Sequence, residues 1–171
     1  MPKGLKPTSS QIVISGQVLE TAPNTFAEAE VDLTLNVLDR EVFVVTACDL
    51  NVFTPDAIAA TDTSMNGSLS STSRVAVGTI SDSNVIAADV KNIRAAGFVD
   101  GGVSFSEKSP DSPTGTNLEY IAIIATNNFF AQCLGVNNVA TRGMNFRVWG
   151  YRAQADANTF AALTQSELLS A

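Results

Sequence analysis

Residues 29–37 read AEVDLTLNV, with an apolar side chain at every odd position and a polar side chain at every even position. A period of two residues is that of a β-strand with one face against a core and the other face in water. Residues 144–153, MNFRVWGYRA, show the same alternation over most of their length. The two segments together predict a β-rich scaffold.

Further strands are expected around these two segments, wherever apolar and β-branched residues run between turn-forming residues. The expected strands are 11–20 (bent at Gly16), 26–38, 41–53, 74–80, 119–126, 129–136 and 144–153, with a hairpin over 98–105. The strands on either side of residues 39–40 are the clearest hairpin candidate, because only two residues separate them. Segment 83–96 fits either a helix or a strand near 84–88, and we expect loops at 55–73 and 107–117.

The chain of 171 residues has the length of one domain with a sizeable core. We expect an extended N-terminal arm at 1–10, a β-sandwich domain at 11–155 and a helical segment at 156–171. Asp156 is expected to cap this short helix. The expected fold class is all-β, a two-sheet antiparallel β-sandwich of eight or nine strands with a short C-terminal helix.

Charged residues make up 16% of the chain, whereas about 25% is usual for a soluble domain. This shortage fits a surface covered by neighbouring subunits, and it fits equally a surface rich in Ser, Thr and Asn. The net charge of −7 disfavours nucleic acid as a partner, because phosphate binding depends on Lys and Arg. Only Lys3 and Lys6 form a local basic tip. No apolar run approaches the ~18 residues of a transmembrane segment, and the N-terminus lacks the apolar region of a signal peptide.

The chain contains no histidine, which is the commonest general base and metal ligand. Cys48 and Cys133 lie in apolar runs and are expected to be buried free thiols, with a disulfide as the open alternative. Oxygen atoms suited to calcium occur in two groups that lack the spacing of a known calcium loop: Asp49, Asn51 and Asp56, and Asp82 with Asn84. We therefore expect no enzyme activity, no cofactor and no resident metal.

The last expected strand carries exposed candidates for binding. Trp149 and Tyr151 fall on the face opposite Phe146 and Val148, beside Arg147. Neighbouring aromatic and arginine side chains are typical of interface hot spots and of sugar-binding platforms, and a strand covered on both faces explains them as well. The candidate interface residues are Lys3, Lys6, Arg147, Trp149, Tyr151 and, roughly on one face of the C-terminal helix, Phe160, Leu163 and Leu168.

Residues 119–135, EYIAIIATNNFFAQCLG, followed by FRVWGYRA at 146–153, resemble the single jelly-roll capsid proteins of icosahedral viruses that infect bacteria and archaea. The resemblance lies in strand rhythm, size and loop-terminated hairpins over about residues 11–155. It implies an eight-stranded jelly-roll sandwich that forms trimers or other capsomers and then a shell, with both terminal segments reaching neighbours or lining the interior. The acidic chain departs from the family in lacking the basic tail that genome-binding coat proteins often carry.

The first functional hypothesis is accordingly a self-assembling capsid or shell protein, assembled in the host cytoplasm and located in the virion. Its expected partners are many copies of itself, with further capsid proteins as an option. The alternative is a non-catalytic binding module of a fibre or adhesin, which would bind a glycan or receptor through Trp149, Tyr151 or the Ser- and Thr-rich segment 61–73.

Overall fold

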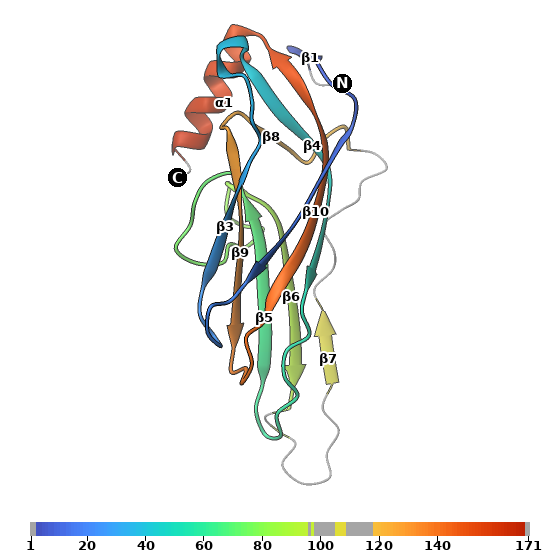
Figure 1. Cartoon of the computed structure of the whole chain (residues 1–171), viewed down its shortest axis with the longest axis vertical. Coiled ribbons are helices and arrows are strands. Elements are labelled where there is room, and N and C mark those ends of the chain that lie inside the picture. Colours follow the sequence, from blue (N-terminus) through green and yellow to red (C-terminus); the bar gives the residue numbers. More distant parts are fainter. Residues whose placement is uncertain (1–2, 96, 98–104, 109–117, 170–171) are drawn as a thin grey trace.

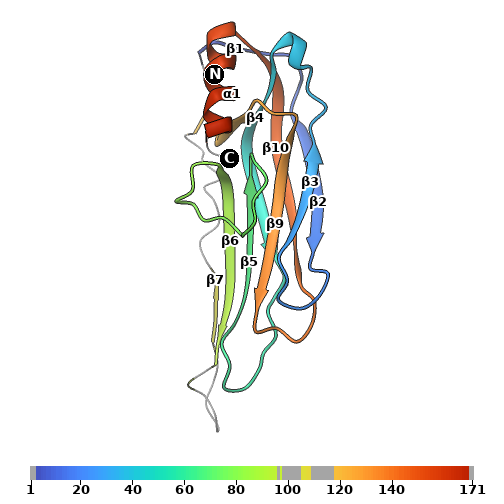
Figure 2. The ribbon, with the colours of Figure 1, turned by 90° about the vertical axis from the view of Figure 1, so that its left-hand side faces the viewer.

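The computed structural model describes residues 3–95, 97, 105–108 and 118–169. The first sheet contains β1 (Leu5–Pro7), β2 (Ile12–Leu19), β4 (Glu41–Val52), β8 (Ala122–Ile124) and β10 (Gly143–Ala155). The second sheet contains β3 (Ala27–Asp32), β5 (Thr63–Ser70), β6 (Val85–Arg94), β7 (Phe105–Lys108) and β9 (Asn128–Val136). A 3-10 turn (Val37–Asp39) precedes β4, and helix α1 (Ala157–Leu169) follows β10. The two sheets form an elongated sandwich with α1 and β1 at the same end (Figure 1, Figure 2).

The strand order is that of a jelly roll. β5 and β6 form the central hairpin, and further pairs enclose it in turn: β4 with β8, β3 with β9, and β2 with β10. Successive pairs fall in opposite sheets, as in the two Greek keys of a jelly roll. β1 pairs with the end of β10, and β7 pairs with β6. The expected two-sheet antiparallel sandwich is confirmed, with ten strands over the described residues rather than eight or nine.

The hairpin predicted across residues 39–40 is wrong. β3 pairs with β9 in the second sheet, whereas β4 pairs with β10 and β8 in the first. The alternation of residues 29–37 continues beyond the strand. β3 ends at Asp32, and Thr34 then has a positive φ of 50°. The Leu35 N–H then donates to the Asn127 side-chain oxygen at 2.5 Å. This polar anchor holds the chain as it crosses from one sheet to the other.

The loop predicted over 55–73 contains a central strand instead. β5 reads TSMNGSLS, and its Met65 and Leu69 are fully buried in the core between the sheets. Gly67 faces the same way, where a Cβ would lie 2.3 Å from the Met144 sulfur. The strand predicted at 74–80 is also wrong, because these residues belong to the long connection between β5 and β6.

Two apolar clusters stabilise the fold. The larger lies between the sheets, where the rings of Phe129 and Phe146 meet edge to face with centroids 6.0 Å apart. The smaller lies on the reverse side of β4, because Val42 and Val44 alternate with core residues along that strand. Helix α1 covers this second cluster, so the C-terminal segment is part of the folded unit.

Helix α1 is capped as predicted, since the Asp156 carboxylate accepts the Thr159 N–H at 2.7 Å. This bond is the main cause that lowers the pKa of Asp156. Phe160 and Leu163, expected as interface residues, pack against the second cluster of their own chain. Leu168 does not, because it is 70% exposed, and the buried residue of that turn is Glu167. Of the three candidate interface residues on this helix, Leu168 is therefore the exposed one, whereas Phe160 and Leu163 are partly buried.

The N-terminal arm is less free than expected. Leu5 is buried in the second cluster, and β1 extends the ladder along β10 by pairing Leu5 with Ala155. Lys3 and Lys6 are exposed on either side of Leu5. Both terminal segments therefore support the sandwich itself, whatever else they contact.

The remaining expectations have mixed outcomes. Strands are confirmed at four expected places: β2 within 11–20, β4 over 41–53, β9 at 129–136 and β10 over 144–153. The strand alternative for 83–96 is correct, although β6 is longer than 84–88. The strand predicted at 119–126 is reduced to β8. The predicted hairpin at 98–105 and loop at 107–117 lie largely outside the described residues.

Candidate functional site

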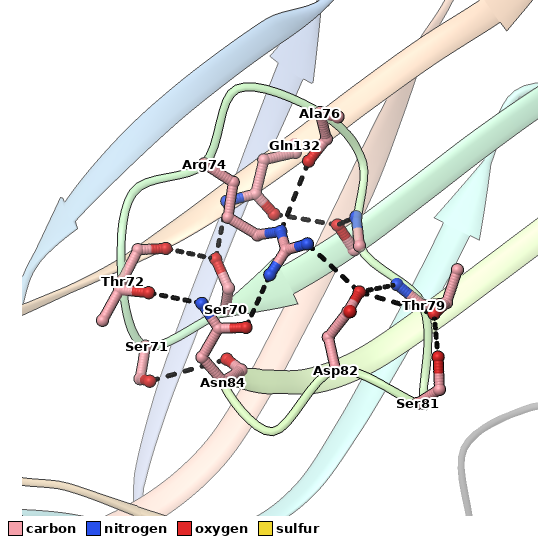
Figure 3. A network of polar contacts seen from close by, with 12 residues as sticks. Ser70, Ser71, Thr72, Arg74, Ala76, Thr79, Ser81, Asp82, Asn84 and Gln132 are labelled. Atoms are coloured by element: carbon pink, nitrogen blue, oxygen red, sulfur yellow. Dashed lines mark hydrogen bonds and ion pairs between the residues drawn. The ribbon is translucent and has the colours of Figure 1, made fainter. Parts of the chain in front are cut away.

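The connection between β5 and β6, residues 71–84, folds over polar side chains on the outer face of the second sheet (Figure 3). Ser68, Ser70 and Gln132 are completely buried there. Gln132 accepts a hydrogen bond from Ser68 Oγ at 2.8 Å and donates to Ser70 Oγ at 2.7 Å. The Gly78 N–H of the connection donates to Ser68 Oγ at 3.0 Å. Because buried polar groups need partners, this network fixes the connection, here called the bracing loop, against the sheet.

Arg74 holds the bracing loop together from inside. Its guanidinium donates to Asn84 Oδ1 at 2.6 Å, to Asp82 Oδ2 at 3.1 Å and to the Ala76 carbonyl at 3.4 Å (Figure 3). Asp82 also accepts the Thr79 N–H at 2.9 Å, which is the main cause that lowers the pKa of Asp82. Planar, multidentate bonding of this kind favours one loop conformation.

The outer end of the bracing loop is tied to β3. Glu28 accepts the Arg74 N–H at 2.8 Å and the Ser73 hydroxyl at 2.6 Å, and it also accepts a bond from Gln132 at 3.0 Å. One carboxylate thus joins the loop, the edge strand and the buried network. The loop is a rigid part of the surface.

Two aliphatic side chains project from the bracing loop into water. Val75 is 96% exposed and Ile80 is 84% exposed. The end of α1 lies beside the loop in both views (Figure 1, Figure 2), and it carries Leu168 and Leu169, which are 70% and 79% exposed. A cavity of ≈ 220 Å³ between loop, β8 and α1 confirms that they are neighbours. We call these four exposed apolar side chains on the two neighbouring segments the lateral patch; exposed apolar surface that gathers on one side of a protein marks interaction sites.

Loss of the Arg74 side chain should loosen the bracing loop. We expect Arg74→Gln to lower the free energy of unfolding by about 1–3 kcal/mol, because it leaves Asn84 and Asp82 without their cationic donor. Amide hydrogen exchange should accelerate across residues 71–84. Arg94→Gln is the matched control, since Arg94 pairs with Asp62 and Glu107 only at exposed positions and should change stability by less than about 1 kcal/mol. Equal exchange in both variants would contradict the bracing role of Arg74.

The candidates on β10 do not form one platform. Trp149 and Arg147 lie on the outer face of the first sheet, with the guanidinium carbon 5.8 Å from the ring centroid. Tyr151 lies on the same face, opposite Phe146 and Val148 as predicted, but it packs against the second cluster, which helix α1 covers. Beside Arg147 a shallow hollow of ≈ 380 Å³ is lined by polar groups that include Asp49 and Asn145. A cation over the indole leaves less of its face for a sugar ring.

The two cysteines lie in the core of the fold. Cys48 and Cys133 are buried and free, as expected. Burial raises the pKa of each thiol to about 12, and the Glu20 carboxylate adds to the effect at Cys133. Neither thiol is therefore a reactive nucleophile near neutral pH.

Three of the five candidate calcium ligands are engaged by arginine side chains. Asp56 pairs with Arg142 and accepts the N–H groups of Val139 and Ala140, whereas Asp82 and Asn84 both bind Arg74. Within the described ranges, no three Cys, Asp or Glu side chains gather in a way that could hold a metal ion. In the same ranges, no helix has the length and apolar character needed to cross a bilayer.

Searches of known protein families and of curated proteins return no match to this chain. The sequence did not identify Val75 and Ile80 as exposed, because the β-branched and apolar residues of segment 74–80 are typical of a strand. The signal against a strand is the turn-rich run Ser81-Asp82-Ser83-Asn84 directly after Ile80.

Proposed function

We propose that this protein is a self-assembling viral capsid or shell protein that acts through contacts between its own copies. The observation that carries the proposal is the bracing loop, which uses a buried polar network to hold Val75 and Ile80 in water. Moving an aliphatic side chain from full exposure to full burial stabilises by about 1.5–3 kcal/mol. A rigid loop that presents two such side chains has already lost the conformational entropy that an interface would otherwise cost.

The jelly-roll strand order supports the same proposal, although this fold also serves lectin and cupin domains. The capsid proteins that the sequence resembles form trimers or other capsomers, and we propose a trimer or larger capsomer here. The low content of charged residues, 16%, suits surfaces that face other copies. The proposed location is the virion, after assembly in the host cytoplasm, with further capsid proteins as possible additional partners.

The net charge of −7 argues against specific contact with the genome, because Lys and Arg supply the affinity for phosphates. Lys3 and Lys6 are exposed, and Lys6 lies on β1, which is paired with β10. Two such lysines are too few for a polyanion-binding tail. We therefore assign the protein to the shell layer alone.

Size-exclusion chromatography of the untagged chain with multi-angle light scattering tests the proposal. We expect a leading peak whose mass is many times that of one chain and which persists on dilution. A monomer at all concentrations would contradict self-assembly of the chain alone.

A second candidate function rests on the polar hollow beside Arg147. Its lining from three strands offers a carboxylate, amides and a hydroxyl, which is the chemistry that binds sugar hydroxyls: Ser15, Asp49, Asn51 and Asn145. Such a site would make the protein a glycan- or receptor-binding module of a fibre or adhesin. A glycan screen with Trp149→Ala as control tests it, since binding that survives this change would not use the indole.

A further inference from the structure

β2 is an edge strand without the usual protection. β10 is the strand that pairs with it, and among the described residues no strand lies on its other side. The eight residues of β2 read IVISGQVL and contain no charge and no proline. The neighbouring edge strand β3, AEAEVD, carries three acidic side chains. Charged side chains are a usual means of keeping an edge strand from pairing with another chain. β3 is therefore protected against such pairing, whereas β2 is not.

The backbone groups on the open side of β2 can be assigned. The Glu20 N–H donates to the Arg142 carbonyl at 2.9 Å, one position beyond the paired Leu19 and Gly143. Hydrogen-bonded and non-hydrogen-bonded pairs alternate along an antiparallel ladder. Even-numbered residues of β2 therefore bond to β10. The odd-numbered residues direct their N–H and C=O groups to the open side: Val13, Ser15, Gln17 and Leu19.

The side chains of β2 match those of β2 in a second copy when the two strands run antiparallel about a two-fold axis at Gly16. In that register Val13 lies opposite Leu19 of the second copy, and these two aliphatic side chains are 52% and 51% exposed. Ser15 then lies opposite Gln17, so polar meets polar on the same face. On the core face Ile14 lies opposite Val18. A shift by two residues would set Val13 against Gln17 and lose this match.

Gly16 suits the position on the axis. The odd-numbered residues supply the hydrogen bonds, so Gly16 and its copy form a non-hydrogen-bonded pair, where the two backbones come closest. A Cβ on Gly16 would lie 2.4 Å from the Phe146 ring. The core therefore requires glycine here. Because glycine has no side chain, Gly16 and its copy can approach closely without a clash.

We infer that β2 pairs antiparallel with β2 of a second copy about Gly16, which extends the first sheet across a two-fold interface. The inference rests on the proposed function, in which the partner is another copy of this chain. It names an interface separate from the lateral patch. An isologous contact of this kind uses the same surface on both subunits.

Disulfide trapping in the full chain tests the register. Val13→Cys combined with Leu19→Cys should oxidise to a covalent dimer, because directly opposite residues lie within disulfide reach. Val13→Cys combined with Gln17→Cys is the matched control, since these positions lie diagonally at about 7–8 Å or more in the inferred register. Each single variant is a further control. The native Cys48 and Cys133 do not interfere, because both are buried and their pKa is about 12.

We expect more than about ten times as much covalent dimer from the first pair as from the control pair. Equal yields, or a higher yield from the control, would overturn the inference even if the protein assembles. A second test uses charge: Val13→Lys with Leu19→Lys should prevent the contact, whereas Val13→Lys with Leu19→Glu should preserve it through opposite charges. Particles that form without trapped dimer would leave the proposed function intact and reject this interface. Trapped dimer without particles would support the interface and reject the shell.

Discussion

Val75→Asp combined with Ile80→Asp should abolish assembly and leave the sandwich folded. Both side chains project from the bracing loop into water, at 96% and 84% exposure, so their replacement removes little from the folded chain. At an interface, each change loses the transfer of an aliphatic side chain, about 1.5–3 kcal/mol, and places a carboxylate there. A loss of about 3 kcal/mol or more per contact weakens association by at least about 100-fold.

Light scattering after size exclusion measures the loss, and far-ultraviolet circular dichroism with thermal unfolding checks the fold. Val139→Asp is the matched control, because Val139 is 75% exposed and follows β9 at the end of the sandwich away from α1 (Figure 1). We expect this control to assemble. If the double variant assembles as the unchanged protein does, the lateral patch is not a subunit contact.

The second large effect is expected at Glu167, which fastens α1 to the turn after β8. Its carboxylate accepts the N–H groups of Ala125 and Thr126, both at 3.0 Å. Glu167→Ala leaves these two donors without a partner, and the Ala125 N–H lies in a buried position. We expect the free energy of unfolding to fall by about 2–4 kcal/mol. Gln165→Ala, at an exposed position of the same helix, should change it by about 0.5 kcal/mol or less.

Chemical denaturation gives both values, and its pH dependence tests the cause. Burial raises the pKa of Glu167 above its usual 4.5, although the two backbone N–H groups oppose the rise. The folded protein therefore binds this proton more tightly than the unfolded chain. The contribution of Glu167 to stability is then greatest at low pH and declines as pH rises from about 4.5 through the raised pKa. Glu167→Gln has no carboxyl group to titrate and should lack this decline. If the difference in unfolding free energy between the unchanged protein and Glu167→Gln stays constant from about pH 4 to about pH 7, the raised pKa of Glu167 is contradicted.

The Glu167 anchor also bears on assembly. Leu168 and Leu169 of the lateral patch follow it directly in α1. Release of this turn would move both side chains away from the bracing loop. Truncation of residues 156–171 is a poorer test of assembly than these point changes, because it would expose Val42 and Val44 of the second cluster.

The class of fold was predictable, because alternation reports which side chains face a core. Leu33 and Leu35 are both buried as their odd positions require. The alternation does not report which strand is the partner. A two-residue gap at 39–40 predicted a hairpin, whereas the positive φ of Thr34 and the bond from Leu35 to Asn127 take the chain to the other sheet. Pairing in a jelly roll joins residues far apart in sequence, and local patterns carry no information about it.

The lateral patch could not be predicted for a related reason. The second half of β5 is buried on both faces, yet the outward residues of the strand are Ser and Asn. Its sequence therefore resembles a loop, and the apolar residues that follow resemble a strand. Only the buried partners of Ser68 and Ser70, supplied by Gln132 and Gly78, show which segment lies in the sheet. On β10, the alternation correctly places Trp149 and Tyr151 on one face, but it cannot show that the cluster beneath α1 partly buries Tyr151.

Electron microscopy of the leading chromatographic peak from the unchanged protein is the most direct test of the proposal that this jelly roll is a shell subunit. The account predicts closed particles, or discrete capsomers of many copies, that are absent from the Val75→Asp and Ile80→Asp double variant. Single sandwiches alone, in both the unchanged protein and the double variant, would contradict it.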